Sequence, residues 1–270
     1  TAGAGVKSRA ARPYAPARGE RIEDARVDAA HEPARAWSRG AVAALALLQV
    51  WVLTAAIADG FGARPVIYKA GRYGVGPATA RILEDLGYLI DASVVPFTSF
   101  SDDGGPDFSA AGFQPSWFGA KGDLLEIPLS CGFHGVLRAL GPALFPWLSS
   151  AAGMRLRLPG IFARSGLLER IRLTPEGVDL AANMRLARSL HQQGCRIFSF
   201  TYHSPSLVPG KTPYVSSQAE LDRFLETMDR FFTFFREELG GRPNDPLEVY
   251  GLLRREPATA TARAAVSAGE

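Results

Sequence analysis

The sequence predicts an α/β fold in which short parallel strands alternate with helices, and three observations support this class. Strand-like runs occur at 66–68, 88–91 and 124–129, and a helical pattern at 77–86 separates the first two. The most strongly β-like run, CRIFSFTY at 195–202, follows a helical pattern, as a parallel crossover connection requires. A chain of 270 residues is long enough to form one main domain of this class.

Composition excludes several classes of protein. The 30 Lys and Arg residues nearly balance 27 Asp and Glu residues, and the net charge of +3 is too small to predict a nucleic-acid partner. The two cysteines, Cys131 and Cys195, lie far apart and without clustered histidines, which excludes a disulfide scaffold and a structural zinc site as the organising feature. Each lies beside a predicted strand, where we expect a small buried side chain.

The two ends of the chain differ in composition from its centre. Residues 1–40 are rich in Ala, Arg, Gly and Glu without a strand or helix period, so we expect a disordered or atypical segment there. The Ala- and Thr-rich tail at 255–270 is also expected to be disordered, which leaves 41–254 as the domain. No signal peptide is recognised, which favours the cytoplasm, and the missing initial Met suggests a fragment.

Residues 41–58, AVAALALLQVWVLTAAIA, form an apolar run of about the minimum length for a membrane span. As a buried helix, this run would end at Asp59 and lead into the strand at 66–68. As a transmembrane helix, it would have Arg35 and Arg39 on its cytoplasmic side. We favour the buried helix, because it explains the same hydrophobicity, and we keep the membrane span as the alternative.

Turn signals place the elements between the strands. Gly87 ends the helix at 77–86, and 96–122 reads as a long loop because Asp, Gly and Ser recur in it. Asp102-Asp103-Gly104 within this loop is interpreted as a turn. Less regular helical segments are expected between 135 and 172.

Capping signals predict two further helices. Thr174 is expected to cap a helix that runs to about Gln193. Ser217 and Glu220 form a capping box at the start of the last helix. Apolar residues follow it at helical spacing and are expected to pack in the core: Leu221, Phe224, Leu225, Met228, Phe231, Phe232 and Phe235.

Candidate functional residues follow the ends of the predicted strands. In folds with parallel strands, working groups collect just past the carboxyl ends of those strands. This rule selects the turn at 69–74, Asp91 with Ser93, Glu126, and His203 after the run at 195–202. We therefore predict that these groups face the same end of the fold.

His203 and the turn KAGRYG at 69–74 each allow two interpretations. An imidazole at a strand end can protonate a leaving group near neutral pH, although a single His in this position can also be structural. The cationic turn would suit a phosphate or carboxylate, but it lacks the spacing of dinucleotide and Walker loops. Arg72 in this turn can equally pair with a buried carboxylate such as Asp91.

Several runs together resemble the polysaccharide deacetylases of carbohydrate esterase family 4, and within the NodB-homology group they are most similar to WalW-type proteins. The resemblance covers roughly residues 53–250, and the block around His203 is its most specific part. The runs are YKAGRYGVGPATARILEDLGYLIDASVVP, GPDF, LLEIPLS, LTPEGVDL, FTYHSPSLVPGKTPYVSSQAELDRFLETMDRFF and FFREELGGRP.

This resemblance implies a distorted (β/α) barrel that hydrolyses N-acetyl groups of amino sugars with a divalent metal, zinc or similar. It would make the protein a hydrolase of non-peptide carbon–nitrogen bonds, with an N-acetylated glycan as substrate. By motif, His203 matches the late acid of the family, Arg72 its Arg-containing motif and Asp91 its Asp-containing motif. The residues expected to contact substrate are Lys69, Tyr73, Ser204 and Tyr214.

The chain departs from the family where the metal ligands should be. The resemblance implies an early Asp-Asp pair and an H-x-x-x-H-type segment, and neither precedes Lys69, where His31 stands alone. His134 and His191 do not supply a second ligand pair, so the metal ligands stay unknown. We expect that residues 1–50 are truncated, substituted or off-frame, that the barrel is incomplete at its N-terminus, and that activity is impaired. A non-catalytic glycan- or protein-binding remnant of the same fold is the alternative.

Overall fold

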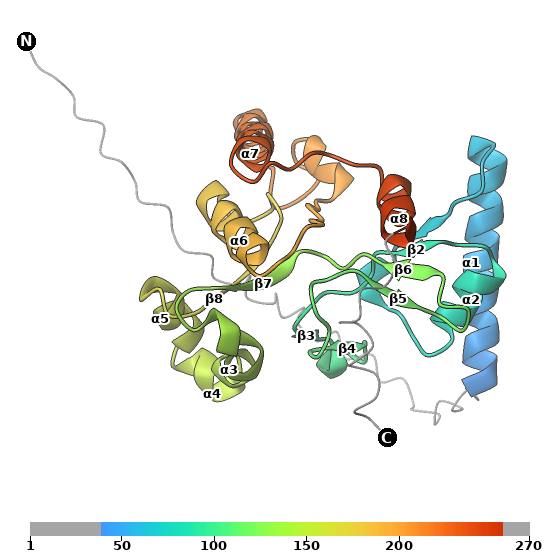
Figure 1. The fold of residues 1–270 in the computed structure, drawn as a ribbon, viewed down its shortest axis with the longest axis horizontal. Helices are drawn as coiled ribbons and strands as arrows, with labels where there is room; N and C mark the ends of the chain where they lie inside the picture. The colour runs from blue at the N-terminus through green and yellow to red at the C-terminus, as the bar shows by residue number, and fades with distance from the viewer. Residues whose placement is uncertain (1–38, 256–270) are drawn as a thin grey trace, which may run out of the picture. The chain divides into compact units, whose positions relative to one another are not determined.

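The computed structural model describes residues 39–255, and Figure 1 shows how the elements succeed one another. The predicted terminal segments, 1–38 of the expected 1–40 and the tail from 256, lie outside the described residues. In chain order the helices and strands are α1 (Arg39–Phe61), β1 (Ile67–Tyr68), α2 (Thr79–Asp85), β2 (Ile90–Asp91), β3 (Thr98–Ser99), β4 (Asp107–Phe108), β5 (Ser116–Phe118), β6 (Leu124–Glu126), β7 (Cys131–His134), α3 (Gly141–Leu148), α4 (Ala151–Arg155), α5 (Leu158–Arg164), β8 (Glu169–Arg172), α6 (Leu180–Gln192), α7 (Gln218–Glu237) and α8 (Pro246–Arg255).

A small, mostly parallel sheet forms the centre of the first half of the domain. Its order is β1-β2-β6-β5, with β1, β2 and β6 parallel and β5 antiparallel to β6. Tyr68 pairs with Asp91, and Asp91 with Glu126, so the three parallel strands end at one level. The predicted strands at 66–68, 88–91 and 124–129 and the α/β class are confirmed. The expected loop at 96–122 is wrong in part, because β3, β4 and β5 lie within it.

No closed barrel is present within residues 39–255. The strands form one sheet of four and two separate pairs, β3–β4 and β7–β8. The antiparallel pair β7–β8 was not predicted as strands, and it joins Cys131 to Arg172 and His134 to Glu169. Its side chains alternate poorly between apolar and polar, so the period of two that marks a half-buried strand is weak in both segments.

The segment 195–202 is not a strand, although its sequence predicts one most strongly. Two isolated hydrogen bonds join it to the residues next to β7 and β8, from Ser199 N to Ser130 Oγ (2.8 Å) and from Thr201 N to the backbone oxygen of Leu173 (3.3 Å). Its aromatic rings pack on α7 instead: Phe200 stacks on Phe231 with ring centroids 4.6 Å apart. Aromatic side chains can pack against a helix as well as on the surface of a sheet. Here their packing on α7 outweighs the pairing of the backbone with a neighbouring strand.

Capping decides where the two predicted helices begin. Asp179 accepts a hydrogen bond from Ala182 N (2.6 Å) and caps α6, so the predicted start at Thr174 is wrong. The predicted cap of α7 is confirmed, since Ser217 Oγ accepts from the backbone N of Glu220 (3.3 Å). Between β8, α6 and α7 lies a core cluster that includes Leu186, Leu190, Phe231 and Phe234.

Helix α1 is formed, but it is exposed. One stripe, which includes Ala46, Val50 and Thr54, packs towards α2, and Thr54 Oγ1 lies 2.8 Å from the hydroxyl of Tyr88. Figure 1 shows α1 beside α2. Other apolar side chains of this helix face away from the domain: Leu45, Leu48, Trp51, Val52 and Leu53 are 49–60% exposed. The prediction of a buried helix at 41–58 is therefore wrong.

Candidate functional site

Lys69, Asp91 and Glu126 meet at the carboxyl ends of β1, β2 and β6, as predicted. The Lys69 Nζ donates to the backbone oxygen of Ala92 (3.0 Å). Ser93 Oγ donates to Asp91 and accepts from the backbone N of Ala70 (2.8 Å). Glu126 Oε1 accepts a hydrogen bond from the backbone N of Val94 (3.0 Å). These bonds tie the three strand ends together, and we call Lys69, Asp91, Ser93 and Glu126 the strand-end cluster.

Burial dominates the electrostatics of the strand-end cluster. Asp91 and Glu126 are 3% and 7% exposed. Burial raises the pKa of Asp91, and the hydrogen bond from Ser93 opposes this rise. Burial, and then the nearby charge of Asp91, raises the pKa of Glu126 to about 8. Burial also lowers the pKa of Lys69, against the attraction of Glu126. Glu126 is consequently mostly protonated at neutral pH.

Tyr73 joins this cluster, but Arg72 does not. Lys69 Nζ lies 5.6 Å from the centroid of the Tyr73 ring, and the Arg172 guanidinium lies 5.9 Å from it. Arg72 is exposed with a left-handed backbone (φ 53°), and no side chain of residues 39–255 makes a hydrogen bond or ion pair with it. The alternative in which Arg72 pairs with Asp91 is wrong, because Ser93 already bonds this buried carboxylate.

His203 pairs with Glu176, a residue that the sequence did not single out. Its Nδ1 lies 2.7 Å from Glu176 Oε2, and its backbone N donates to Glu176 Oε1 (2.9 Å). Ser206 Oγ also donates to Glu176 Oε1 (2.5 Å). The Glu176 side chain is 6% exposed and that of His203 is 71% exposed. A buried carboxylate thus fixes one edge of an imidazole whose other edge faces solvent.

The expectation that all strand ends converge is met only in part. Among the described residues, no hydrogen bond or ion pair links His203 to the strand-end cluster. Strand β8 connects the two groups along the chain, since Arg172 lies over Tyr73 and Glu176 follows four residues later. The two other predicted substrate contacts, Ser204 and Tyr214, are exposed near His203 in sequence, and Ser204 begins a short 3₁₀ turn.

The predicted metal is not matched by a ligand set in the described part of the chain. Within residues 39–255, no group of three His, Cys, Asp or Glu side chains is arranged to hold an ion. Asp102 and Asp103 lie in a 3₁₀ turn that ends at the left-handed Gly104, as the turn interpretation predicts. His134 lies on β7 and His191 on α6, and His31 lies outside the described residues.

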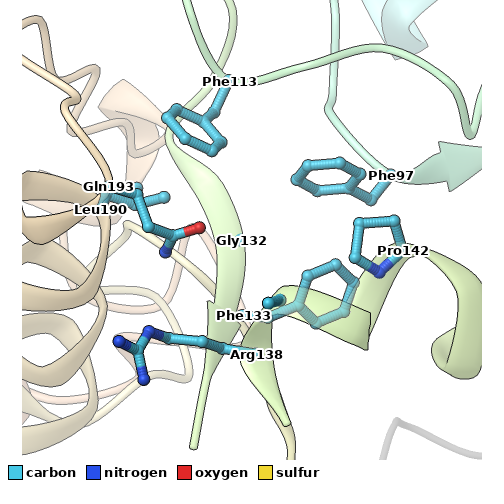
Figure 2. A pocket seen from close by; sticks show the side chains of 9 residues that line it. Phe97, Phe113, Gly132, Phe133, Arg138, Pro142, Leu190 and Gln193 are labelled. Atoms are coloured by element: carbon cyan, nitrogen blue, oxygen red, sulfur yellow. The ribbon is translucent and has the colours of Figure 1, made fainter.

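A cavity of about 100 Å³ lies apart from these groups. Figure 2 shows the rings of Phe97 and Phe133 and Pro142 around it, with the polar ends of Arg138 and Gln193 towards another side. None of the predicted site residues lines it, so its mainly apolar wall does not mark the predicted site.

Comparisons with known proteins identify no relative. No protein-family model, curated protein or solved structure matches the chain significantly. Function must therefore be inferred from the residues themselves and from the resemblance of their motifs.

Proposed function

We propose that this chain is a carbohydrate amidase of the polysaccharide deacetylase type, which removes N-acetyl groups from amino sugars. The observation that carries the proposal is the pair formed by the buried Glu176 and the exposed His203, inside the run most similar to the family. The same proposal includes the distorted barrel of that family as a more detailed description of the α/β fold.

His203 has the geometry of a general acid. A carboxylate only accepts hydrogen bonds, so the proton between the two side chains lies on Nδ1 of the imidazole and leaves Nε2 towards solvent. During amide hydrolysis, a water oxygen bonds to the carbonyl carbon and releases a proton to the solvent, the carbon–nitrogen bond breaks to leave acetate, and the leaving nitrogen takes a proton. The imidazolium supplies this proton from Nε2, while Glu176 stabilises the charged ring and fixes its orientation.

The strand-end cluster does not fit a divalent metal. The charge of Lys69 acts on both carboxyls, and within residues 39–255 no three His, Cys, Asp or Glu side chains are arranged to hold an ion. Both features oppose a bound cation. We therefore assign no step to a metal held by these residues, and we give Asp91 a positioning role, since it is 3% exposed and bonded to Ser93.

Acetate release from N-acetylated glucosamine oligosaccharides tests the proposal directly. We expect the full chain to release acetate, measured by a coupled acetate assay, with and without added zinc. Bound metal should be measured on the same samples by elemental analysis. Absence of acetate release under both conditions, from folded protein, would contradict the amidase and favour the non-catalytic glycan-binding alternative.

A second candidate function is membrane attachment through α1, and the exposure of this helix favours it. The window Ala44–Phe61 has a mean hydropathy of 1.7, yet only 6% of it is buried. A 23-residue helix is about 35 Å long, which matches a hydrocarbon core of about 30 Å. A core helix of a soluble domain would instead be mostly buried.

Vesicle flotation tests membrane attachment. We expect the full chain to float with phosphatidylcholine vesicles and Leu53→Lys to lower the bound fraction about tenfold or more, because a lysine at the centre of an inserted helix is costly. Leu156→Lys is the matched control, since Leu156 is 66% exposed outside α1. A wild-type chain that stays with the soluble fraction in the absence of detergent would contradict this candidate.

A further inference from the structure

A cationic pocket lies between β7, the 3₁₀ turn Arg138–Leu140 and α6, apart from the residues of the proposed reaction. Its cavity measures about 240 Å³. His134, Arg138, Arg185, Arg188, Ser189 and Gln192 line it. Three guanidinium groups on one small cavity repel one another unless anions compensate their charges, and within residues 39–255 only two carboxylates, Glu169 and Glu238, pair with them.

Two of the three arginines are held in place without using all of their donors. Arg185 binds Glu169 through Nη2 (3.0 and 3.3 Å), and Arg188 binds Glu238 through Nε and Nη2 (3.2 and 2.6 Å). Each guanidinium has five N–H donors, so both retain unused ones. The Arg188 guanidinium also lies 4.6 Å from the centroid of the Phe234 ring, which restricts its orientation. These two side chains are thus preorganised.

Arg138 leaves the pocket with a net positive charge. The two carboxylates balance Arg185 and Arg188, whereas Arg138 forms no ion pair within residues 39–255 and donates only a long bond (3.5 Å) to a backbone oxygen. The charges of Arg185, Glu169 and Arg138 all act on His134. Burial, followed by the charge of Arg185, lowers the pKa of His134, and an anion in the cavity would oppose that shift.

We propose that this pocket binds a small tetrahedral oxyanion, the phosphoryl group of inorganic phosphate or of a phosphate ester, between Arg138, Arg185 and Arg188. Guanidinium groups bind phosphate oxygens with two parallel hydrogen bonds, which a carboxylate-rich or apolar wall cannot offer. The cavity is smaller than the roughly 300 Å³ at which pockets for drug-sized ligands begin, so a small anion suits it best. The inference does not depend on the proposed amidase activity.

Thermal unfolding with sodium phosphate, compared with sodium chloride at equal ionic strength, tests the site. A ligand that binds only the folded state raises the Tm in proportion to its occupancy. We expect phosphate to raise the Tm of the full chain, and Arg138→Gln to weaken the apparent affinity about tenfold or more, since a charge-assisted donor is lost. Arg155→Gln, at an exposed arginine of α4, should leave the affinity unchanged.

An NMR titration of the wild-type chain provides a second test that no variant can confound. Phosphate should shift the ring resonances of His134 and raise its pKa, and those of His191 should stay in place. Methyl phosphate as a second probe distinguishes the sources: tighter binding than inorganic phosphate indicates an ester, and weaker binding indicates the free ion. Unmoved His134 resonances, or an equal affinity for phosphate in Arg138→Gln and the wild type, would overturn the proposal.

Discussion

Replacing His203 with alanine is expected to lower kcat for acetate release by about 10²–10⁴-fold, the usual contribution of a general acid. Without the imidazole, the leaving nitrogen must take its proton from water. The side chain is 71% exposed, so its removal should leave the midpoint of chemical denaturation nearly unchanged. Steady-state kinetics on the N-acetylated oligosaccharide, combined with unfolding curves, measure both effects.

Two further variants test whether His203 acts as the general acid or only lies near the reaction. Glu176→Gln should lower kcat less than His203→Ala, because the amide still fills the buried site but no longer stabilises the charged ring. His191→Ala on α6 is the matched control and should keep wild-type kinetics. Wild-type acetate release by His203→Ala would exclude His203 as the acid, whatever the effect of Glu176→Gln.

The strand-end cluster was predictable because its geometry follows from a single rule. Parallel strands deliver their carboxyl ends to one edge of a sheet, so identifying the strands at 66–68, 88–91 and 124–129 also places Lys69, Asp91 and Glu126 together. The distance from each side chain to its neighbours depends on rotamers, which a strand pattern does not encode. For this reason the strand pattern left open a pairing of Arg72 with Asp91, where Lys69 is the nearby cation.

Glu176 was missed because its local sequence also matches the start of a helix. Thr174, Pro175 and Glu176 match the start of a helix, and in that context the glutamate would be a solvated first-turn residue. In the structure the helix begins at Leu180, and Glu176 instead lies beside His203, 27 residues further along the chain. Glu176 lies in the run LTPEGVDL and His203 in the run that contains HSPS, and no local pattern in either run predicts a contact between them.

The hydrophobic pattern predicted where helices and strands form better than it predicted which of them are buried. Helix α1 was expected in the core, yet composition measures only how apolar a segment is and not whether enough neighbours exist to cover it. The strand prediction at 195–202 is wrong for a related reason. β-propensity reports a fit to a half-buried surface, and the rings of Phe198 and Phe200 find that surface on α7.

Replacing Glu126 with glutamine is expected to remove much of the loss of stability between pH 4.5 and pH 8. Glutamine keeps the oxygen that accepts from the backbone N of Val94 and is never charged. The pKa of Glu126 is about 8 in the folded protein, against 4.5 as its ordinary value. As pH rises through this window, the unfolded chain loses a proton that the folded chain retains, so wild-type stability falls.

The size of this effect follows from the same shift. A difference of this order between folded and unfolded pKa values corresponds to roughly 3–5 kcal/mol of stability lost across the window. Urea unfolding at several pH values measures it, and the gap between Glu126→Gln and the wild type should widen steadily from pH 5 to pH 8. Glu237→Gln is the control, because the Glu237 side chain is 63% exposed. Parallel stability curves for Glu126→Gln and the wild type would mean that Glu126 is ionised in the folded protein, and a cation at the strand ends would then become reasonable.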